Sequence, residues 1–182
     1  MSVATGDVSI ASLSKRSVHR IRTDTGTSPR GRQTLTDETK PIDFELRFAN
    51  GERLGVSLLG SGSEPASLWR VFTSIRELAN LPSNWDSYGS QPLAASAVRR
   101  SFNLLPLVLS DTSPAPSVIP TRDGGVQFEW HRGGIDIEVK IPPSGSAPYL
   151  IADAGTGVEQ ESEESLDLPA IREALERISA AQ

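Results

Sequence analysis

The chain has 182 residues, of which 37% are hydrophobic, carries a formal net charge of −5 and contains no cysteine. This length and composition predict one folded domain with part of the chain outside its core, and the lack of cysteine excludes disulfides, thiolate metal sites and a cysteine nucleophile. No apolar run approaches the roughly 20 residues that cross a bilayer, and the first residues lack a secretory signal pattern, so we expect a cytoplasmic protein without a membrane segment.

The first 40 residues differ from the rest of the chain in charge and composition. Residues 1–40 hold seven basic and four acidic side chains, whereas 41–182 hold eleven basic and nineteen acidic ones. The first segment is rich in Ser, Thr and Gly, so it has little apolar surface to offset the entropy lost on ordering. We predict a disordered basic tail over 1–40 and a single α+β domain over 41–182. The basic side chains within 15–32 also suggest nucleic-acid binding through phosphate contacts.

Two strands are predicted at the start of the domain. Apolar and polar residues alternate over 42–48 and again over 54–58, which is typical of half-buried strands. The Asn-Gly pair at 50–51 marks a turn between them. Because a loop of odd length keeps the apolar side chains on one face, we predict a bulged turn that sets Phe48 opposite Leu54.

Three later segments have the spacing of amphipathic helices. Apolar residues recur every three or four positions over about 67–81, 94–105 and 168–178. Proline lacks the backbone N–H that a helix interior needs, so we expect the second helix to end at Pro106. Asp167 directly precedes the third segment and is a residue type that caps helix N-termini. The sequence therefore predicts three helices that each bury one face.

Four short segments between the second and third helices alternate apolar and polar residues and are predicted to be strands. Gly133 and Gly134 form a tight turn between the two clearest of them. The acidic stretch 159–164 that follows is expected to be a solvated linker. An antiparallel meander with one apolar face must cover that face, so we predict an α+β fold, of order ββ-αα-ββββ-α, in which about three helices cover one face of the sheet. The four segments predicted to be strands between the second and third helices are 118–121, 126–131, 135–141 and 149–152.

The polar face of the hairpin at 126–141 carries the strongest candidate for chemistry. The Gly-Gly turn pairs Glu129 with Glu138, and His131 with Asp136, on this face. Such nitrogen and oxygen ligands could hold Mn²⁺, Zn²⁺ or Mg²⁺, or form a general acid–base pair. These four residues are therefore candidates for the catalytic or metal site of a metal-dependent enzyme, such as a hydrolase or nuclease. The alternative is a solvated face whose carboxylates pair with basic neighbours.

Two shorter patterns bear on the enzyme hypothesis. Glu138-Val139-Lys140, with Asp123 earlier in the chain, matches the Glu-x-Lys pattern of nucleases that use two metal ions. This pattern recurs by chance, and the acidic domain argues against an enzyme that cuts duplex nucleic acid. His131 is the single histidine of the predicted domain, and no serine has the context of a nucleophile. We therefore favour a protein that is not an enzyme and expect no cofactor, with a divalent metal as the alternative.

The loop between the first two predicted helices is rich in aromatic and turn-forming residues. It consists of Asn-Trp-Asp-Ser-Tyr-Gly over 84–89. In one interpretation, the rings of Trp85 and Tyr88 are buried and Asp86 bonds the backbone of the turn. In the other, Trp85, Asp86 and Tyr88 form a recognition loop that binds a protein partner.

Two motifs of the chain resemble a family of small bacterial hypothetical proteins. They are the Trp-Asp-x-Tyr-Gly loop within 84–89 and the x-Gly-Gly-x-x-x-Glu-Trp hairpin within 120–131. The resemblance covers roughly 66–153 and implies no activity, substrate or ligand. It does imply a bacterial accessory protein of a small gene system, antitoxin-like or associated with phage defence. The leading hypothesis is therefore a non-catalytic protein-interaction module.

Overall fold

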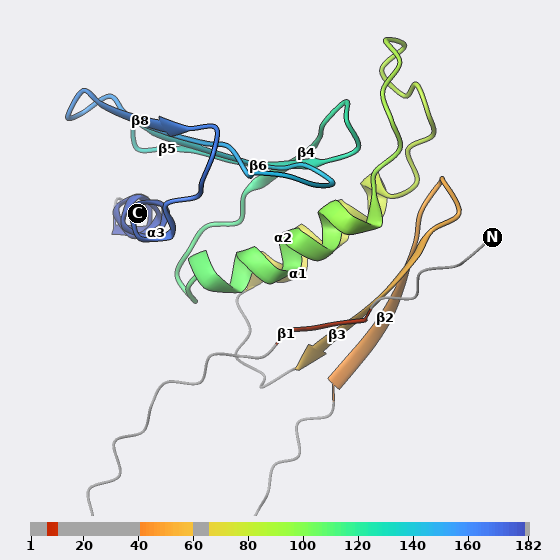
Figure 1. The fold of residues 1–182 in the computed structure, drawn as a ribbon. Coiled ribbons are helices and arrows are strands. Elements are labelled where there is room, and N and C mark those ends of the chain that lie inside the picture. Colours follow the sequence, from red (N-terminus) through yellow and green to blue (C-terminus); the bar gives the residue numbers. More distant parts are fainter. Residues whose placement is uncertain (1–6, 11–40, 60–65, 181–182) are drawn as a thin grey trace, which may run out of the picture.

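A computed structural model describes residues 7–10, 41–59 and 66–180 of the chain, in which two β-sheets enclose a layer of helices (Figure 1). The strands are β1 (Asp7–Ile10), β2 (Pro41–Arg47), β3 (Arg53–Leu59), β4 (Ser117–Pro120), β5 (Val126–Arg132), β6 (Ile135–Ile141), β7 (Tyr149–Asp153) and β8 (Val158–Ser162). The helices are α1 (Ala66–Leu78), α2 (Ala95–Val108) and α3 (Leu168–Ala180). The smaller sheet has the strand order β1-β3-β2, and the larger sheet has the order β4-β5-β6-β7-β8.

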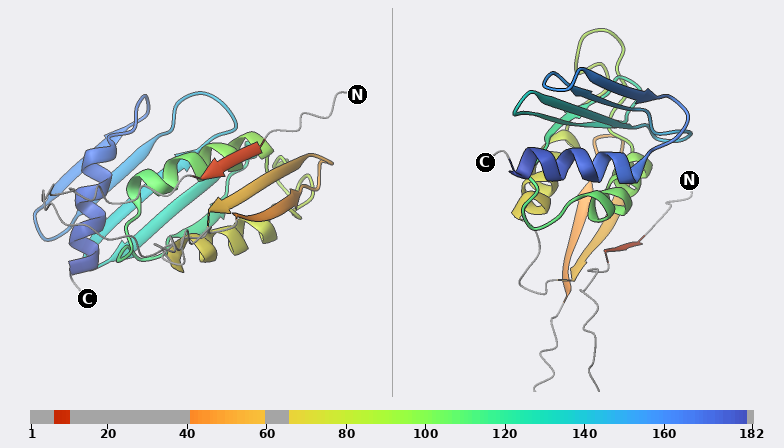
Figure 2. Two further views of the ribbon diagram at one scale, coloured as in Figure 1. Left: turned by 90° about the horizontal axis from the view of Figure 1, so that it is seen from below. Right: turned by 90° about the vertical axis from the view of Figure 1, so that its left-hand side faces the viewer.

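The helices α1 and α2 lie between the two sheets, and α3 packs against α2 and β6 beneath the larger sheet (Figures 1 and 2). The apolar surface of α2 is broad enough to meet both sheets, because its buried residues extend around much of the helix. A helix with a single narrow apolar stripe would leave one of the sheets uncovered. The buried residues of α2 are Ala95, Ala97, Val98, Ser101, Phe102, Leu104, Leu105 and Val108.

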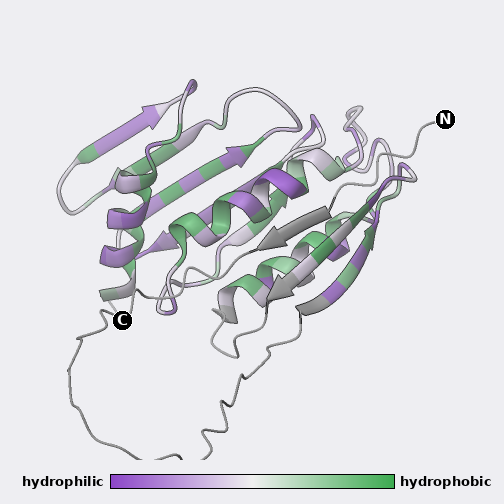
Figure 3. Cartoon of the chain, turned by 60° about the horizontal axis from the view of Figure 1, so that its bottom comes forward, coloured by the Kyte–Doolittle hydropathy of each residue, from purple (hydrophilic) through white to green (hydrophobic). Residues whose placement is uncertain are grey.

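Aromatic rings join the smaller sheet to the helices. Between ring centroids, Phe44 of β2 lies 4.7 Å from Phe72 of α1, which lies 6.1 Å from Phe102 of α2. Tilted and edge-on pairs of this kind each contribute about 0.5–1.5 kcal/mol beyond the burial of their area. On the larger sheet, hydrophobic and hydrophilic residues alternate along the strands (Figure 3), and the inward side chains, such as Phe128, are fully buried. A single core therefore connects both sheets through the helices.

The predicted α+β class is confirmed, and the predicted order of strands and helices matches the structure apart from two added strands, β1 and β8. The structure differs in placing β2 and β3 in a separate sheet, across the helical layer from the meander. The apolar face of this first hairpin needs a cover of its own, and the sides of α1 and α2 that face away from the larger sheet supply it. All three helices lie on one side of the larger sheet, as predicted, and among the described elements none covers its other side (Figure 1). We call that uncovered side the outer face.

The two hairpins show how far local patterns fix strand pairing. In the β5–β6 hairpin, the predicted pairs Glu129–Glu138 and His131–Asp136 are confirmed. The first hairpin has a turn of odd length, as predicted, but Leu54 lies opposite Leu46 instead of Phe48. Apolar side chains still face the core in this register, because a shift of two residues preserves the face.

Several predicted elements differ in their bounds: α1 ends at Leu78, three residues before the predicted end, and two other differences have a clear physical reason. The helix α2 runs through Pro106 to Val108, because a proline near the end of a helix removes a single hydrogen bond and the last turn is well packed. The acidic stretch expected to be a linker contains β8. Its Gln160 points inward and donates to the Tyr149 hydroxyl at 2.7 Å, while glutamates on either side face out. A strand whose inward residue is polar lacks the apolar alternation that predicts strands.

The predicted disordered tail falls mostly outside the described residues. Within 1–40, the structure describes 7–10, which form β1 and pair in parallel with β3. The basic side chains proposed to contact nucleic acid, within 15–32, lie outside the described residues. In the described ranges, no helix combines the length and apolar character needed to cross a membrane.

Candidate functional site

One end of the molecule is formed by three connections that are bonded to one another. They are the β2–β3 turn (48–52), the loop between α1 and α2 (79–94) and the β4–β5 turn (121–125), and we call them together the loop end. Backbone hydrogen bonds fix their relative positions. These bonds run from Ala49 N–H to Ala79 O at 2.8 Å, from Gln91 N–H to Arg122 O at 2.8 Å and from Ala94 N–H to Gly124 O at 2.9 Å.

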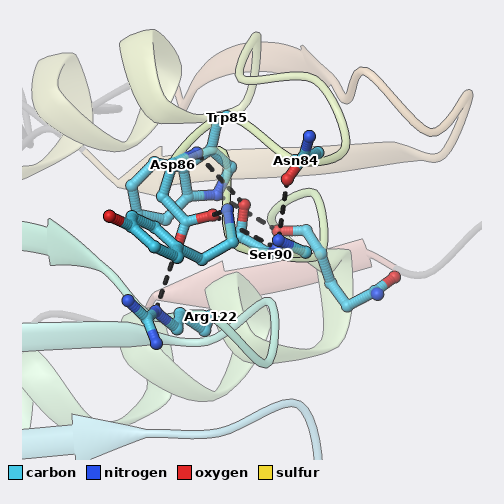
Figure 4. Close-up of polar contacts among 8 residues, drawn as sticks. Asn84, Trp85, Asp86, Ser90 and Arg122 are labelled. Carbon is cyan, nitrogen blue, oxygen red and sulfur yellow. Dashed lines mark hydrogen bonds and ion pairs between the residues drawn. The ribbon is translucent and has the colours of Figure 1, made fainter.

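Polar side chains inside the loop hold its backbone in place (Figure 4). The Asp86 carboxylate accepts hydrogen bonds from the backbone N–H of Tyr88 at 2.8 Å and of Ser90 at 3.3 Å. The Asn84 side-chain oxygen accepts from the N–H of Gly89 at 2.7 Å. Asx-type bonds of this kind replace the backbone bonds that a helix or sheet would supply. The loop is therefore ordered by its own residues.

The backbone of this loop takes an uncommon conformation at two residues other than glycine. Asn84 has φ 60° and Ser87 has φ 65°, whereas a third positive value, 85°, falls on Gly89. The left-handed region costs a residue with a Cβ roughly 1–2 kcal/mol. The hydrogen bonds around Asp86 and Asn84 offset that cost, and the resulting path turns Tyr88 outward.

Arg122 of the β4–β5 turn links the loop to the larger sheet. Its Nε lies 2.9 Å from the Asp86 carboxylate, whose side chain is 12% exposed, and its guanidinium lies 5.2 Å from the centroid of the Tyr88 ring. Burial alone would raise the pKa of Asp86, but hydrogen bonds from Tyr88 and Ser90 and the charge of Arg122 together lower it below its ordinary value of 3.8. Asp86 is thus kept ionised, and Arg122 is placed against the ring by both an ion pair and a cation–π contact.

The three predicted partner-binding residues have different positions. Tyr88 is 78% exposed. Trp85 is half-buried, and its indole N–H donates to the Gln91 carbonyl at 3.3 Å. Asp86 is occupied by the bonds described above. Tyr88 is therefore the residue available to a partner, and Trp85 and Asp86 hold the loop that presents it.

Glu52 is a residue of the loop end that sequence reasoning missed. Its carboxylate accepts the backbone N–H of Ala95 at 2.9 Å and so caps α2 from the β2–β3 turn. The residue in the N-cap position, Ala94, has no side chain that could do this. A negative charge at a helix N-terminus also interacts favourably with the helix dipole. No sequence signal identifies this contact, because the two residues are 43 positions apart.

The candidate catalytic and metal-binding residues lie together on the outer face, but hydrogen bonds already occupy them. His131 is bonded on one side to Asp136 and on the other to Glu129. The Gln127 amide donates to Glu129 at 2.8 Å and to Glu138 at 3.1 Å, which relieves the repulsion expected between these two carboxylates. Within the described ranges, no group of three or more His, Cys, Asp or Glu side chains is arranged to hold a metal ion. In this arrangement the four candidate side chains are bonded to one another or to Gln127.

The charged residues of the Glu-x-Lys pattern also bond other side chains. Lys140 lies 3.6 Å from the carboxylate of Asp123, and Glu138 is bonded to Gln127. Both Lys140 and Asp123 are partly exposed at the junction between the loop end and the outer face. This surface ion pair contributes little stability on its own.

Comparisons of the chain with protein-family models, curated proteins and solved structures give no match. The resemblance to a family of small bacterial proteins therefore stays a prediction, as does the accessory role that it implies. The function proposed below depends on the geometry of the loop end.

Proposed function

We propose that this chain is a non-catalytic protein-interaction module that binds a partner protein through the loop end, with Tyr88 as the central contact. The observation that carries the proposal is the exposure of Tyr88 on a loop that is otherwise held by hydrogen bonds and an ion pair. Among the large hydrophobic side chains that the structure describes, Tyr88 is the most exposed. Tyrosine and arginine are also the residue types enriched in the contacts that dominate protein interfaces.

The energetics favour such a role for a tyrosine presented in this way. An aromatic side chain buries about 150–250 Å² of surface. Because Tyr88 is 78% exposed, a partner could cover roughly 120–200 Å² of it, a gross gain of about 3–5 kcal/mol at about 25 cal/mol per Å². Ordering a free side chain on binding costs about 0.5–1.5 kcal/mol. That cost is reduced here, because Arg122 and the loop backbone already position the ring.

The test is the effect of Tyr88→Ala on binding. The tagged full-length chain is used to capture its partner from the source cell, and the affinity of the purified partner is then measured for the wild type and two variants. Loss of a central contact costs about 2 kcal/mol or more, which corresponds to a loss of affinity of about 30-fold or more. The matched control is Val158→Ala, which truncates a residue that is 56% exposed on β8, away from the loop end.

The control variant should bind within a few-fold of the wild type, and all three proteins should have the same melting temperature. If no partner is captured in stoichiometric amount, or if Tyr88→Ala binds as tightly as Val158→Ala, the proposal is wrong.

A further inference from the structure

His131 lies between two carboxylates on the outer face. Its Nδ1 is 2.9 Å from Asp136 Oδ1 on the neighbouring strand β6, and its Nε2 is 3.1 Å from Glu129 Oε2, two residues earlier on β5. The side chains of His131 and Asp136 are half exposed, whereas that of Glu129 is 18% exposed. The imidazole can therefore exchange protons with solvent while it is held on both sides.

Whether His131 can make both contacts at once depends on its protonation state. A neutral imidazole carries one N–H and one lone pair, whereas an imidazolium carries two N–H groups. An ionised carboxylate can only accept. Only protonated His131 can therefore donate to Glu129 and Asp136 together, and a neutral ring places a lone pair against one of the carboxylates. In agreement, hydrogen bonds to Asp136 and then to Glu129 raise the pKa of His131 above its ordinary value of 6.5, although burial opposes them.

The other charges on the outer face favour the protonated state as well. The strands β4 and β7 contribute uncharged side chains to this face. Arg132 follows His131 on β5 and alternates to the opposite side. Lys140 is paired with Asp123. The charged residues of the outer face are Glu129 on β5, Asp136, Glu138 and Lys140 on β6, and Glu159 and Glu161 on β8.

We propose that His131 forms a pH-dependent hydrogen-bonded link within the β5–β6 hairpin, which we call the clasp. When protonated, it bonds Asp136 across the strands and Glu129 along its own strand. When it loses the proton, it releases one of the two carboxylates and the outer face loses one positive charge. A released Glu129 faces Glu138 in the strand register, with the Gln127 amide as their remaining link.

The direction of the pH dependence follows from the bonded state. A histidine whose pKa is raised in the folded protein stabilises the fold fully below its unfolded value, here 6.5, and that contribution is lost as the pH rises through the folded value. The clasp is therefore closed at mildly acidic pH and opens toward alkaline pH. The net charge of the outer face becomes more negative over the same pH range.

A titration of the imidazole signals of the full-length chain by NMR tests the proposal. The chain has two histidines, so His19→Gln assigns the signal of His131. We expect His131 to titrate above 6.5, Asp136→Asn and Glu129→Gln each to lower its pKa, and the backbone amides on both strands beside it to follow the same curve. The matched control is Glu161→Gln, which removes a charge from the same face two strands away from β6. A His131 pKa at or below 6.5, or an effect of Asp136→Asn no larger than that of Glu161→Gln, would overturn the proposal.

A second measurement separates the clasp from simple packing. The melting temperatures of the wild type and of His131→Ala are compared at a pH below 6.5 and at an alkaline pH. The clasp predicts a higher melting temperature for the wild type at the lower pH and a difference that shrinks at the higher pH. A difference that is the same at both values would show that the ring acts through packing alone and that the clasp does not exist.

Discussion

Glu52 provides a sharp test of how the loop end is held together. Its carboxylate caps α2 by accepting the Ala95 N–H, and it also accepts from the Asn50 side chain at 3.0 Å. Replacing Glu52 with alanine removes the one side chain that, among the described residues, caps the first turn of α2. The variant should therefore be less stable, although Glu52 lies on the surface and makes no apolar contact with the core.

The size of the effect follows from two contributions. Loss of a helix cap typically costs about 1 kcal/mol. Loss of a negative charge beside a helix N-terminus costs about 0.3–1 kcal/mol. The sum, about 1–2 kcal/mol, corresponds to a fall in melting temperature of about 2–8 °C for a chain of this size. Glu52→Gln keeps an oxygen acceptor but removes the charge, so it should lose only the second contribution.

Thermal and urea unfolding of the full-length chain measure the effect. Glu173→Ala is the control, because it removes an exposed glutamate from α3 that lies beyond the first turn of that helix. We expect stability to fall in the order wild type, Glu52→Gln, Glu52→Ala, with Glu173→Ala close to the wild type. Equal stabilities of Glu52→Ala and Glu173→Ala would refute the long-range cap.

Two further predictions concern the larger sheet. A Cβ on Gly125 would lie 2.7 Å from the Ile141 carbonyl oxygen and 2.6 Å from the Thr121 hydroxyl. Gly125→Ala should therefore lower the free energy of unfolding by about 1–3 kcal/mol. The control is Ser144→Ala, at an exposed residue, and an equal loss of stability in the two variants would show that position 125 has room for a Cβ. The ion pair with Arg177, followed by the other hydrogen bonds of Asp153, lowers the pKa of Asp153 from 3.8 to about 2. Because a lowered carboxyl pKa stabilises the fold above the unfolded value, that stability should disappear as the pH falls from 3.8 to about 2. Acid unfolding of Asp153→Asn should lack this loss, and parallel curves for the two proteins would contradict the assignment.

The parts of the fold that the sequence predicts are those fixed by neighbouring residues. The β5–β6 register follows from the Gly133-Gly134 turn, where both residues have positive φ, together with strict alternation on either side. The cap of α3 is similarly local, since Asp167 accepts the Ala170 N–H at 3.0 Å, as predicted. In both cases the residues that decide the geometry lie within a few positions of one another.

The parts that the sequence does not predict depend on residues far apart in the chain. Separation of β2 and β3 into their own sheet depends on two sides of α2 being covered at once, which helical periodicity alone does not reveal. In the loop, the sequence marks Trp85 and Tyr88 as aromatic but cannot say which ring is covered. The fold of the whole loop turns Tyr88 outward, and the ring then contacts Arg122, from a turn that comes more than thirty residues later. The bridging role of Gln127 likewise requires both strands to be in place.

The most direct test of partner binding through the loop end is NMR mapping of the complex. The isotope-labelled full-length chain is titrated with the captured partner, and the change of each backbone amide signal is recorded. We predict the largest changes in the loop that carries Tyr88 and in the β4–β5 turn that carries Arg122, with the outer face of β8 unaffected. Changes confined to the outer face, with the signals of Tyr88 and Arg122 unmoved, would contradict the account.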